Sequence, residues 1–354
     1  MSYTVKPIDD QKTYDAFLKT PALKPHLTFM HTWEWGEVLK AESKQFLRIG
    51  IYDKDTLVGV AQIVQQPLKF GGFYWYAPRG IVMNYHNVKT VTAAYTALDG
   101  FVKERGGAFF KVDPDLVRDD KAVTAIDASG AQPSAMFTQA ERVWCVDLQQ
   151  DEAGLLAWMK DHGMRSNIPY YLRRAARGDA TIRMSDDPKD LDTLLELLGQ
   201  LRERKHMVGG GDKHLRRQFA ALSPKGYEHV FIAEKDDQIV AAALISIYGR
   251  EASYLHGAST ELFRELRIPH LIHLEIMKYL MAERPEVERY NFWGIVSDKN
   301  RKPGHPRNGY SEFKRSFGGY KEEYMRARDF VYKPLYWRLE WLLQKYWAWK
   351  YKND

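Results

Sequence analysis

The chain has 354 residues, 45% of them hydrophobic, which is long enough for two domains and too apolar for a disordered protein. A formal net charge of +6 fits a phosphate-rich partner but does not by itself select one. The one cysteine, Cys145, excludes an intramolecular disulfide framework and a cysteine-based zinc site. No apolar run approaches the roughly 18 residues of a membrane span, and the N-terminus has no signal pattern. We therefore expect a cytoplasmic protein, either soluble or peripheral at the inner face of the membrane.

The first half of the chain is predicted to contain two helices, a β-hairpin, a further long helix and a short strand. In the hairpin, an acidic turn separates two β-rich apolar runs. These segments are residues 10–18, 32–43, 49–64, 88–104 and 109–114. The residues that follow, 115–139, are rich in Asp, Ala, Ser, Gly and Pro and are expected to form a surface loop or excursion.

The second half repeats this order. The hairpin predicted at residues 230–245 resembles that at 49–64, with Lys235 in register with Lys54. Two helices precede it, and a long helix and the short strand "YNFWGI" follow it. Each half is interpreted as α-α-β-β-β-α-β, the order used by GNAT-type acyltransferases. The predicted fold class is therefore α/β (α+β), with two tandem GNAT-like domains.

Two further helical regions lie outside the repeated order. Residues 159–180 are predicted to form a basic helix pair between the halves, and the tail is predicted to form a basic, aromatic helix. The simpler interpretation packs an apolar stripe of the tail onto the first domain, and the alternative is contact with a membrane surface. The stripe is formed by Leu335, Leu339, Leu342 and Tyr346, while Trp337 and Trp341 lie outside it.

Glycine is missing where a GNAT enzyme would bind the pyrophosphate of acyl-CoA. That site needs backbone N–H groups at a helix N-terminus, which glycine lets the phosphate approach closely. The corresponding segments read "NYHNVKTVTAAY" and "FRELRIPHLIHLEIM", and Pro269 removes one amide donor from the second. Acyl-CoA is therefore disfavoured as the acyl donor, and no cofactor is expected.

Seven segments, in order, resemble the motifs of the FemABX family of peptidoglycan bridge-forming aminoacyltransferases, over about residues 29 to 333. They are "FMHTWEWGEVL" (29–39), "YAPRGIV" (76–82), "FFKVDPD" (109–115), "MRSNIPYYLRRAARGD" (164–179), "YLHGAS" (254–259), "YNFWGI" (290–295) and "EFKRSFGG" (312–319).

The resemblance implies a reaction and a domain arrangement. An amino acid would pass from aminoacyl-tRNA to the side-chain amine of the third residue of the peptidoglycan stem peptide. The acceptor would be UDP-MurNAc-pentapeptide or its lipid-linked form, lipid II. The first domain would comprise residues 1–148 with the returning segment 318–354, and the second residues 149–317. The segment "LLGQLRERKHMVGGGDKHL" leaves no room for the coiled-coil arm of some members, which indicates a compact member.

The resemblance also implies a site around "EFKRSFGG". Phe313 would stack on the terminal adenine of the tRNA, and Lys314 would stabilise the developing oxyanion or bind the terminal phosphates. The plain structural alternative for Lys314 is a lysine that snorkels beside a packed helix. Tyr254, at a strand end, would touch the stem peptide, although such a tyrosine is commonly half-buried core.

Further substrate contacts are expected from both domains. Arg204 matches an arginine that binds the nucleotide-sugar portion, and Arg202 competes for this assignment. Trp35 and Lys40 lie where the first domain contributes to the cleft. Lys40 would reach a diphosphate or be a plain solvated lysine.

The last two candidates are Arg79, which follows a proline, and Asp113, which precedes one. Arg79, in "APRG", would hold a phosphate or brace its domain, and Asp113, in "KVDP", would orient the acceptor amine, accept its proton or simply begin a turn. The residues show no other general base. The histidines show no metal-ligand spacing, and His270 and His273 are expected on a helix surface.

Two rival functions stay open at this point. One is a GNAT-type transferase that acts on another amine, such as a lipid headgroup. The other is a non-catalytic tRNA-binding envelope protein. The residues indicate no protein partner and do not specify which amino acid is transferred.

Overall fold

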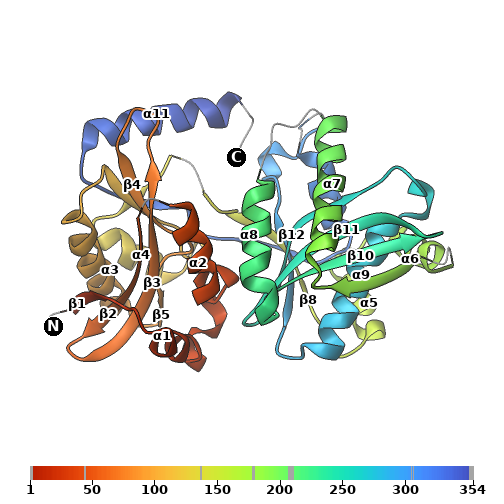
Figure 1. Cartoon of the computed structure of the whole chain (residues 1–354), viewed down its shortest axis with the longest axis horizontal. Coiled ribbons are helices and arrows are strands. Elements are labelled where there is room, and N and C mark those ends of the chain that lie inside the picture. The colour runs from red at the N-terminus through yellow and green to blue at the C-terminus, as the bar shows by residue number, and fades with distance from the viewer. Residues whose placement is uncertain are drawn as a thin grey trace. The chain divides into compact units, whose positions relative to one another are not determined.

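The computed structural model describes residues 3–43, 45–135, 138–177, 180–205, 211–303, 305 and 307–350 (Figure 1). The chain divides into two compact units. Unit 1 comprises Met1–Arg142, Val296–His305 and Glu322–Asp354, and unit 2 comprises Val143–Ile295 and Pro306–Lys321. These bounds differ from the predicted domains, 1–148 with 318–354 and 149–317, chiefly in assigning 296–305 to unit 1. The predicted boundaries stay a prediction.

Unit 1 is a mixed sheet with helices packed on it. Its strands have the order β1-β2-β3-β4-β6-β15-β7, with β5 paired to β3. The pair β4/β6 is parallel and the neighbouring pairs are antiparallel. Its elements are β1 (Tyr3–Pro7), α1 (Gln11–Leu18), η1 (Pro21–His26), η2 (Phe29–His31), α2 (Trp33–Glu42), β2 (Phe46–Asp53), β3 (Thr56–Pro67), β4 (Phe73–Ala77), β5 (Val82–Met83), α3 (Val88–Lys103), β6 (Phe109–Val112), α4 (Lys121–Ala128), β7 (Gln132–Pro133), η5 (Asp298–Asn300), β15 (Arg328–Val331) and α11 (Pro334–Lys350).

The second sheet has the order β14-β8-β13-β12-β11-β10-β9. Here the pair β12/β13 is parallel, and the hairpin β10/β11 is antiparallel. The elements are β8 (Arg142–Asp147), α5 (Glu152–Asp161), α6 (Ile168–Arg177), β9 (Thr181–Ser185), α7 (Pro188–Lys205), α8 (Asp212–Leu222), η3 (Ser223–Lys225), β10 (Glu228–Lys235), β11 (Gln238–Tyr248), β12 (Glu251–Ser259), η4 (Arg264–Leu266), α9 (Ile268–Glu283), β13 (Arg289–Gly294), α10 (Asn308–Arg315) and β14 (Tyr320–Glu323).

The same strand order occurs in both sheets. In unit 1, β2-β3-β4 is an antiparallel run, and α3 connects β4 to the parallel strand β6. In unit 2, β10-β11-β12 is the matching run, and α9 connects it to the parallel strand β13. Both predicted hairpins and both long helices are present. The mixed α/β class predicted from the sequence is therefore confirmed.

Alternation along β10 explains how unit 2 builds two hydrophobic layers. Phe231 and Ala233 belong to a core cluster with residues of α9, whereas Val230 and Ile232 belong to another cluster with residues of α7 and α8. Successive side chains of a strand point to opposite faces of the sheet. The sheet of unit 2 is therefore covered by helices on both faces.

Two predictions about unit 1 are wrong. Residues 115–139 are not simply a surface loop, because α4 lies within them and buries Val123 and Ile126 in the core of unit 1. Asp120 caps this helix by accepting a hydrogen bond from the backbone of Ala122. The polar composition of the segment hid a short amphipathic helix. The second error is the simpler interpretation of the tail helix, α11, because its apolar stripe is exposed and not packed on unit 1, with Leu335 79% exposed.

Candidate functional site

Lys314 lies in an aromatic setting within unit 2. It lies in the last turn of α10, a helix of eight residues, and its side chain is buried. Its Nζ donates a hydrogen bond of 2.8 Å to the carbonyl oxygen of Gly294, at the end of β13. The same atom lies 5.0 Å from the ring centre of Tyr310 and 5.8 Å from that of Tyr254. Carbonyl and ring faces thus surround the ammonium group.

No carboxylate forms an ion pair with Lys314 among the described residues. Burial alone lowers the pKa of its ammonium group from 10.5 to about 7. A buried lysine without a counter-charge is unfavourable for folding, since its desolvation is not offset. The snorkelling alternative is not what the structure shows, because the side chain is 8% exposed.

The helix face next to Lys314 packs into a cluster of rings. Phe313 is partly buried, and its ring centre lies 5.3 Å from that of Phe317 and 4.9 Å from that of His270. The ring of Phe292 lies 4.9 Å from Phe317 and 5.0 Å from His273. Lys314 therefore borders a rigid aromatic wall in unit 2.

The prediction that His270 and His273 lie on a helix surface is wrong for His273, whereas His270 is partly buried. His273 is 2% exposed, and its Nδ1 lies 2.8 Å from the hydroxyl oxygen of Tyr290. Burial lowers the pKa of His270 to about 4 and that of His273 to about 3. Both rings are therefore neutral near pH 7 and add no positive charge beside Lys314.

The glycine pair after α10 places this helix against unit 2. Gly318 and Gly319 have φ values of +79° and +115°. A side chain on Gly318 would collide with the backbone of Met159, and one on Gly319 with the carbonyl oxygen of Cys145. Only glycine permits this conformation and this close approach. The pair thus ends α10 and brings its last turn, with Lys314, close to the neighbouring backbone.

Tyr254 is partly buried on β12, and burial raises the pKa of its phenol to about 12. Its ring packs edge-on against His273, with ring centres 4.5 Å apart. The predicted residues Lys314, Phe313 and Tyr254 are therefore brought together in unit 2.

The two competing arginines both carry a carboxylate partner. Arg204, near the end of α7, pairs with Glu261 at 2.5 Å and donates to the carbonyl oxygen of Ser259 at 3.1 Å. Arg202 pairs with Asp212 at 3.1 Å. The guanidinium of Arg204 is exposed, so an anionic ligand would compete with Glu261 for it.

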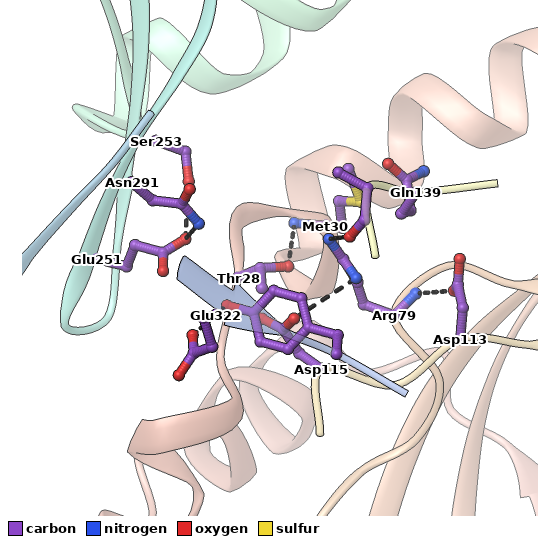
Figure 2. Close-up of polar contacts among 12 residues, drawn as sticks. Thr28, Met30, Arg79, Asp113, Asp115, Gln139, Glu251, Ser253, Asn291 and Glu322 are labelled. Atoms are coloured by element: carbon purple, nitrogen blue, oxygen red, sulfur yellow. Dashed lines mark hydrogen bonds and ion pairs between the residues drawn. The ribbon is translucent and has the colours of Figure 1, made fainter. Parts of the chain in front are cut away.

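Arg79 and Asp113 lie together in unit 1 (Figure 2). Arg79 has a φ of +57° in the turn after β4, and its backbone N–H donates to Asp113 Oδ1 at 2.9 Å. The other oxygen of Asp113 accepts from the hydroxyl of Tyr76 at 2.8 Å. The Arg79 guanidinium lies 3.5 Å from Asp115 and is buried.

Both groups thus brace the turn of unit 1. Burial raises the pKa of Asp113, and the charge of Arg79 and the hydrogen bond from Tyr76 oppose this rise. The roles predicted for Asp113 and Arg79 toward substrate stay predictions.

Trp35 and Lys40 lie on opposite faces of α2 in unit 1. Trp35 is 6% exposed, and its ring lies 5.3 Å from that of Phe29. Lys40 is exposed in the last turn of the helix. Trp35 is therefore part of the core, whereas the Lys40 ammonium is open to a ligand.

Sequence reasoning missed a polar group at the beginning of β12. Glu251 accepts hydrogen bonds from Ser253 at 2.8 Å and from Asn291 at 3.0 Å (Figure 2). It also forms an ion pair with Arg289 at 2.5 Å. Strands β12 and β13 are parallel here, and the group ties them together. The acidic residue after a turn gave no signal of this contact. Within the described part of the chain, no group of three or more His, Cys, Asp or Glu residues could hold a metal ion.

The model of the FemAB family matches residues 10–142, and that of the acetyltransferase (GNAT) domain matches residues 162–315. The lipid II:glycine glycyltransferase of Staphylococcus saprophyticus is 22% identical over 401 residues, covering 93% of each chain. A crystal structure of FemX superposes with a TM-score of 0.81 at 19% identity, covering 96% of this chain and 100% of that one.

The chain is therefore similar to the FemAB family in its N-terminal part, and over most of its length to a lipid II:glycine glycyltransferase and to FemX. The relatives from Staphylococcus are named as glycyltransferases, which supports the predicted aminoacyltransferase activity. A tandem GNAT protein from the clavulanic acid pathway is also similar in fold, with a TM-score of 0.51 at 11% identity, covering 93% of this chain and 98% of that one. The prediction of two GNAT-like domains is thereby confirmed.

Proposed function

We propose that this chain is a FemABX aminoacyltransferase that moves an amino acid from aminoacyl-tRNA to the side-chain amine of the third residue of the peptidoglycan stem peptide. The acceptor would be lipid II or UDP-MurNAc-pentapeptide. The relative from Staphylococcus saprophyticus is named for glycine transfer to lipid II, which makes lipid II and glycyl-tRNA the first pair to test. Aminoacyl-tRNA as the donor rests on the family resemblance and on the absence of glycines from the acyl-CoA segments.

The reaction is an aminolysis of an ester. The neutral amine attacks the ester carbonyl carbon, a C–N bond forms, and the carbonyl oxygen becomes negatively charged. The C–O bond to the tRNA ribose then breaks, and the proton lost by the attacking nitrogen ends on the ribose oxygen. Catalysis requires a donor at the developing oxyanion, because such electrostatic stabilisation is commonly the largest contribution.

Lys314 is the residue that best fits this requirement. Its Nζ uses one hydrogen for the Gly294 carbonyl, so two remain for a ligand. Its charge is neither paired with a carboxylate among the described residues nor diluted by solvent, which makes it strong toward a nearby anion. This buried lysine without a carboxylate partner is the observation that supports the proposed role.

The test combines the full chain with total tRNA charged with labelled amino acids and either lipid II or UDP-MurNAc-pentapeptide. Acceptors with lysine and with diaminopimelate at position three are compared. Mass spectrometry of the acceptor is expected to show a gain of one amino-acid residue. The absence of a gain with every acceptor, while the chain still binds tRNA, would contradict the proposed reaction.

Lys314→Met is expected to lower turnover at least about a hundredfold, as the removal of an oxyanion donor does. It should not destabilise the fold, because it replaces a buried, unpaired charge by an apolar group of similar size. Lys160→Met, at an exposed lysine of unit 2, is the matched control and should keep full turnover. Full turnover in Lys314→Met would exclude Lys314 from the chemistry.

The pH dependence separates two roles of Lys314. If the ammonium form acts on the oxyanion, turnover should fall as the pH rises through about 7, where that form is lost. Lys314→Arg keeps the charge and should abolish this fall. A rise through the same pH, lost in the arginine variant, would instead identify the neutral amine as a general base.

A further inference from the structure

Helix α11 follows β15 in unit 1 (Figure 1), and several of its apolar side chains are exposed. Leu335 is 79% exposed and Trp349 is 76% exposed, and none of the residues of this helix is buried. The spacing of the exposed residues is i, i+4, i+7, i+11 and i+14, which is one face of an α-helix. This outer stripe comprises Leu335, Leu339, Leu342, Tyr346 and Trp349.

Trp337 anchors the opposite side of the helix. Its ring packs on the cluster of Leu68, Ala108 and Phe109, and its Nε1 donates a hydrogen bond of 2.8 Å to Asp329. Asp329 is buried and is tied by an ion pair of 3.0 Å to Lys111. The tryptophan thereby fixes the rotation of α11 about its axis, and that rotation leaves the outer stripe exposed.

A second aromatic contact supports the same orientation. Lys69, in the loop after β3, places its Nζ 4.3 Å from the ring centre of Trp347. Trp337 and Trp347 are ten residues apart, which places them within about 80° of each other on a helical wheel. Both ends of the helix are thus held by its inner side.

The charges of α11 are unequal. Its sequence contains Arg338, Lys345 and Lys350 but only one acidic residue, Glu340. Arg338 and Lys345 are exposed, whereas Glu340 is partly buried and accepts a hydrogen bond of 3.0 Å from Gln344. The exposed charge beside the outer stripe is therefore positive.

We propose that α11 binds the surface of an anionic lipid bilayer, lying in the plane of the surface with the outer stripe among the acyl chains. Leucines along the stripe supply apolar area, Tyr346 and Trp349 suit the polar–apolar boundary, and Arg338 and Lys345 meet acidic headgroups. No helix of the described residues is long and apolar enough to cross a membrane, so the contact is peripheral.

The alternative to a bilayer is that the outer stripe packs against the same stripe of a second copy of the chain. Pairing by a coiled coil requires about three to four heptads, and α11, with 17 residues, contains little more than two. Cationic residues on the flank of the stripe would also face each other in a symmetric pair. The bilayer is therefore favoured. The inference concerns where the chain is held and does not depend on the reaction proposed above.

The test is flotation of the full chain with unilamellar vesicles of phosphatidylglycerol and phosphatidylcholine, and with vesicles of phosphatidylcholine alone. We expect the chain to float with the anionic vesicles and to be released as salt is raised. Leu339→Gln with Leu342→Gln should weaken binding at least about tenfold, because two buried apolar side chains are lost. Leu262→Gln, at a leucine that is 53% exposed in unit 2, is the matched control and should bind as the natural chain does.

Three outcomes would overturn the proposal. They are no flotation at low salt, equal flotation of the double glutamine variant, and a concentration-dependent dimer that the double variant abolishes. Sedimentation velocity without vesicles measures the last of these. The double variant Arg338→Gln with Lys345→Gln tests the electrostatic contribution separately. It should reduce binding to anionic vesicles and leave the oligomeric state unchanged.

Discussion

Two buried lysines of this chain differ in whether a carboxylate lies close enough to compensate the charge of the ammonium group. Lys111 in unit 1 is 2% exposed and lies 3.0 Å from the carboxylate of Asp329. Lys314 in unit 2 is 8% exposed and has a carbonyl and two rings beside it, with no carboxylate among the described residues. The fold neutralises the first lysine and leaves the second uncompensated. A cost in stability without a structural benefit is the pattern expected of a functional residue.

Glu228 is a buried acid whose titration should make the free energy of unfolding depend on pH. It is fully buried at the start of β10, one oxygen accepts from Gln218 at 2.5 Å, and the other has no hydrogen-bond partner in the described part of the chain. Burial raises its pKa from 4.5 to about 8. The folded state therefore holds this proton more tightly than the unfolded state does.

The sign of the pH effect follows from this difference. The contribution of Glu228 is fully present below pH 4.5 and is lost as the pH rises toward 8, by up to about 1.4 kcal/mol per pH unit. Glu228→Gln, which stays neutral, should remove this dependence and be more stable than the natural chain at pH 8. Denaturant unfolding at pH 5, 6.5 and 8 measures it. Parallel curves for the two proteins would show that Glu228 is not responsible.

At the scale of elements, α10 illustrates how the residues that end a helix can position a candidate catalytic side chain. The helix has only eight residues, too few to be stable by itself. Its position depends on Phe317 in the aromatic cluster and on the glycines behind it, where Gly319 donates to His162 at 3.0 Å. Trp144 adds a hydrogen bond of 2.8 Å to the carbonyl oxygen of Gly318. Lys314 is placed by this packing and not by helix propensity.

Gly318→Ala should therefore lower both stability and turnover. The new methyl group would collide with the backbone of Met159, at a φ of +79° that alanine disfavours. We expect a loss of about 2 kcal/mol or more in the free energy of unfolding, measured by chemical denaturation. Gly309→Ala, in the same helix with nothing close to the new group, is the control and should be neutral or stabilising by up to about 1 kcal/mol. Equal stabilities of the two variants would contradict this account of the glycine pair.

At the scale of the whole molecule, the two units differ in how much of each is built from one continuous stretch of the chain. The core of unit 2 is formed within Val143–Ile295 and Pro306–Lys321, one continuous stretch apart from ten residues. Unit 1 needs the C-terminal segment, because β15 lies between β6 and β7 in its sheet. Phe330 of β15 also belongs to its hydrophobic core.

Fragments of the chain should reflect this difference. Residues 143–321 are expected to fold alone, with cooperative thermal unfolding and dispersed amide resonances. Residues 1–142 are expected not to, because the missing strand exposes the edge of β6 and part of the core. Adding the missing segment 322–354 to the shorter fragment as a separate peptide should restore cooperative folding. A stable fold of 1–142 without it would contradict this dependence.

The sequence alone located the main helices and both hairpins in their correct order. Hydrophobic alternation and acidic turns located both hairpins, and the repeated order indicated a duplicated α/β unit, because these signals are local. The residues around Lys314 were also predicted, through motifs that are contiguous in the chain. Periodicity shows that a helix has an apolar face and does not show what covers it. For that reason the outward stripe of α11, the burial of His273 and the core role of α4 were decided only by the tertiary structure. The surroundings of Lys314, which include no carboxylate partner among the described residues, were decided there too, since its neighbours Gly294 and Tyr254 are distant along the chain.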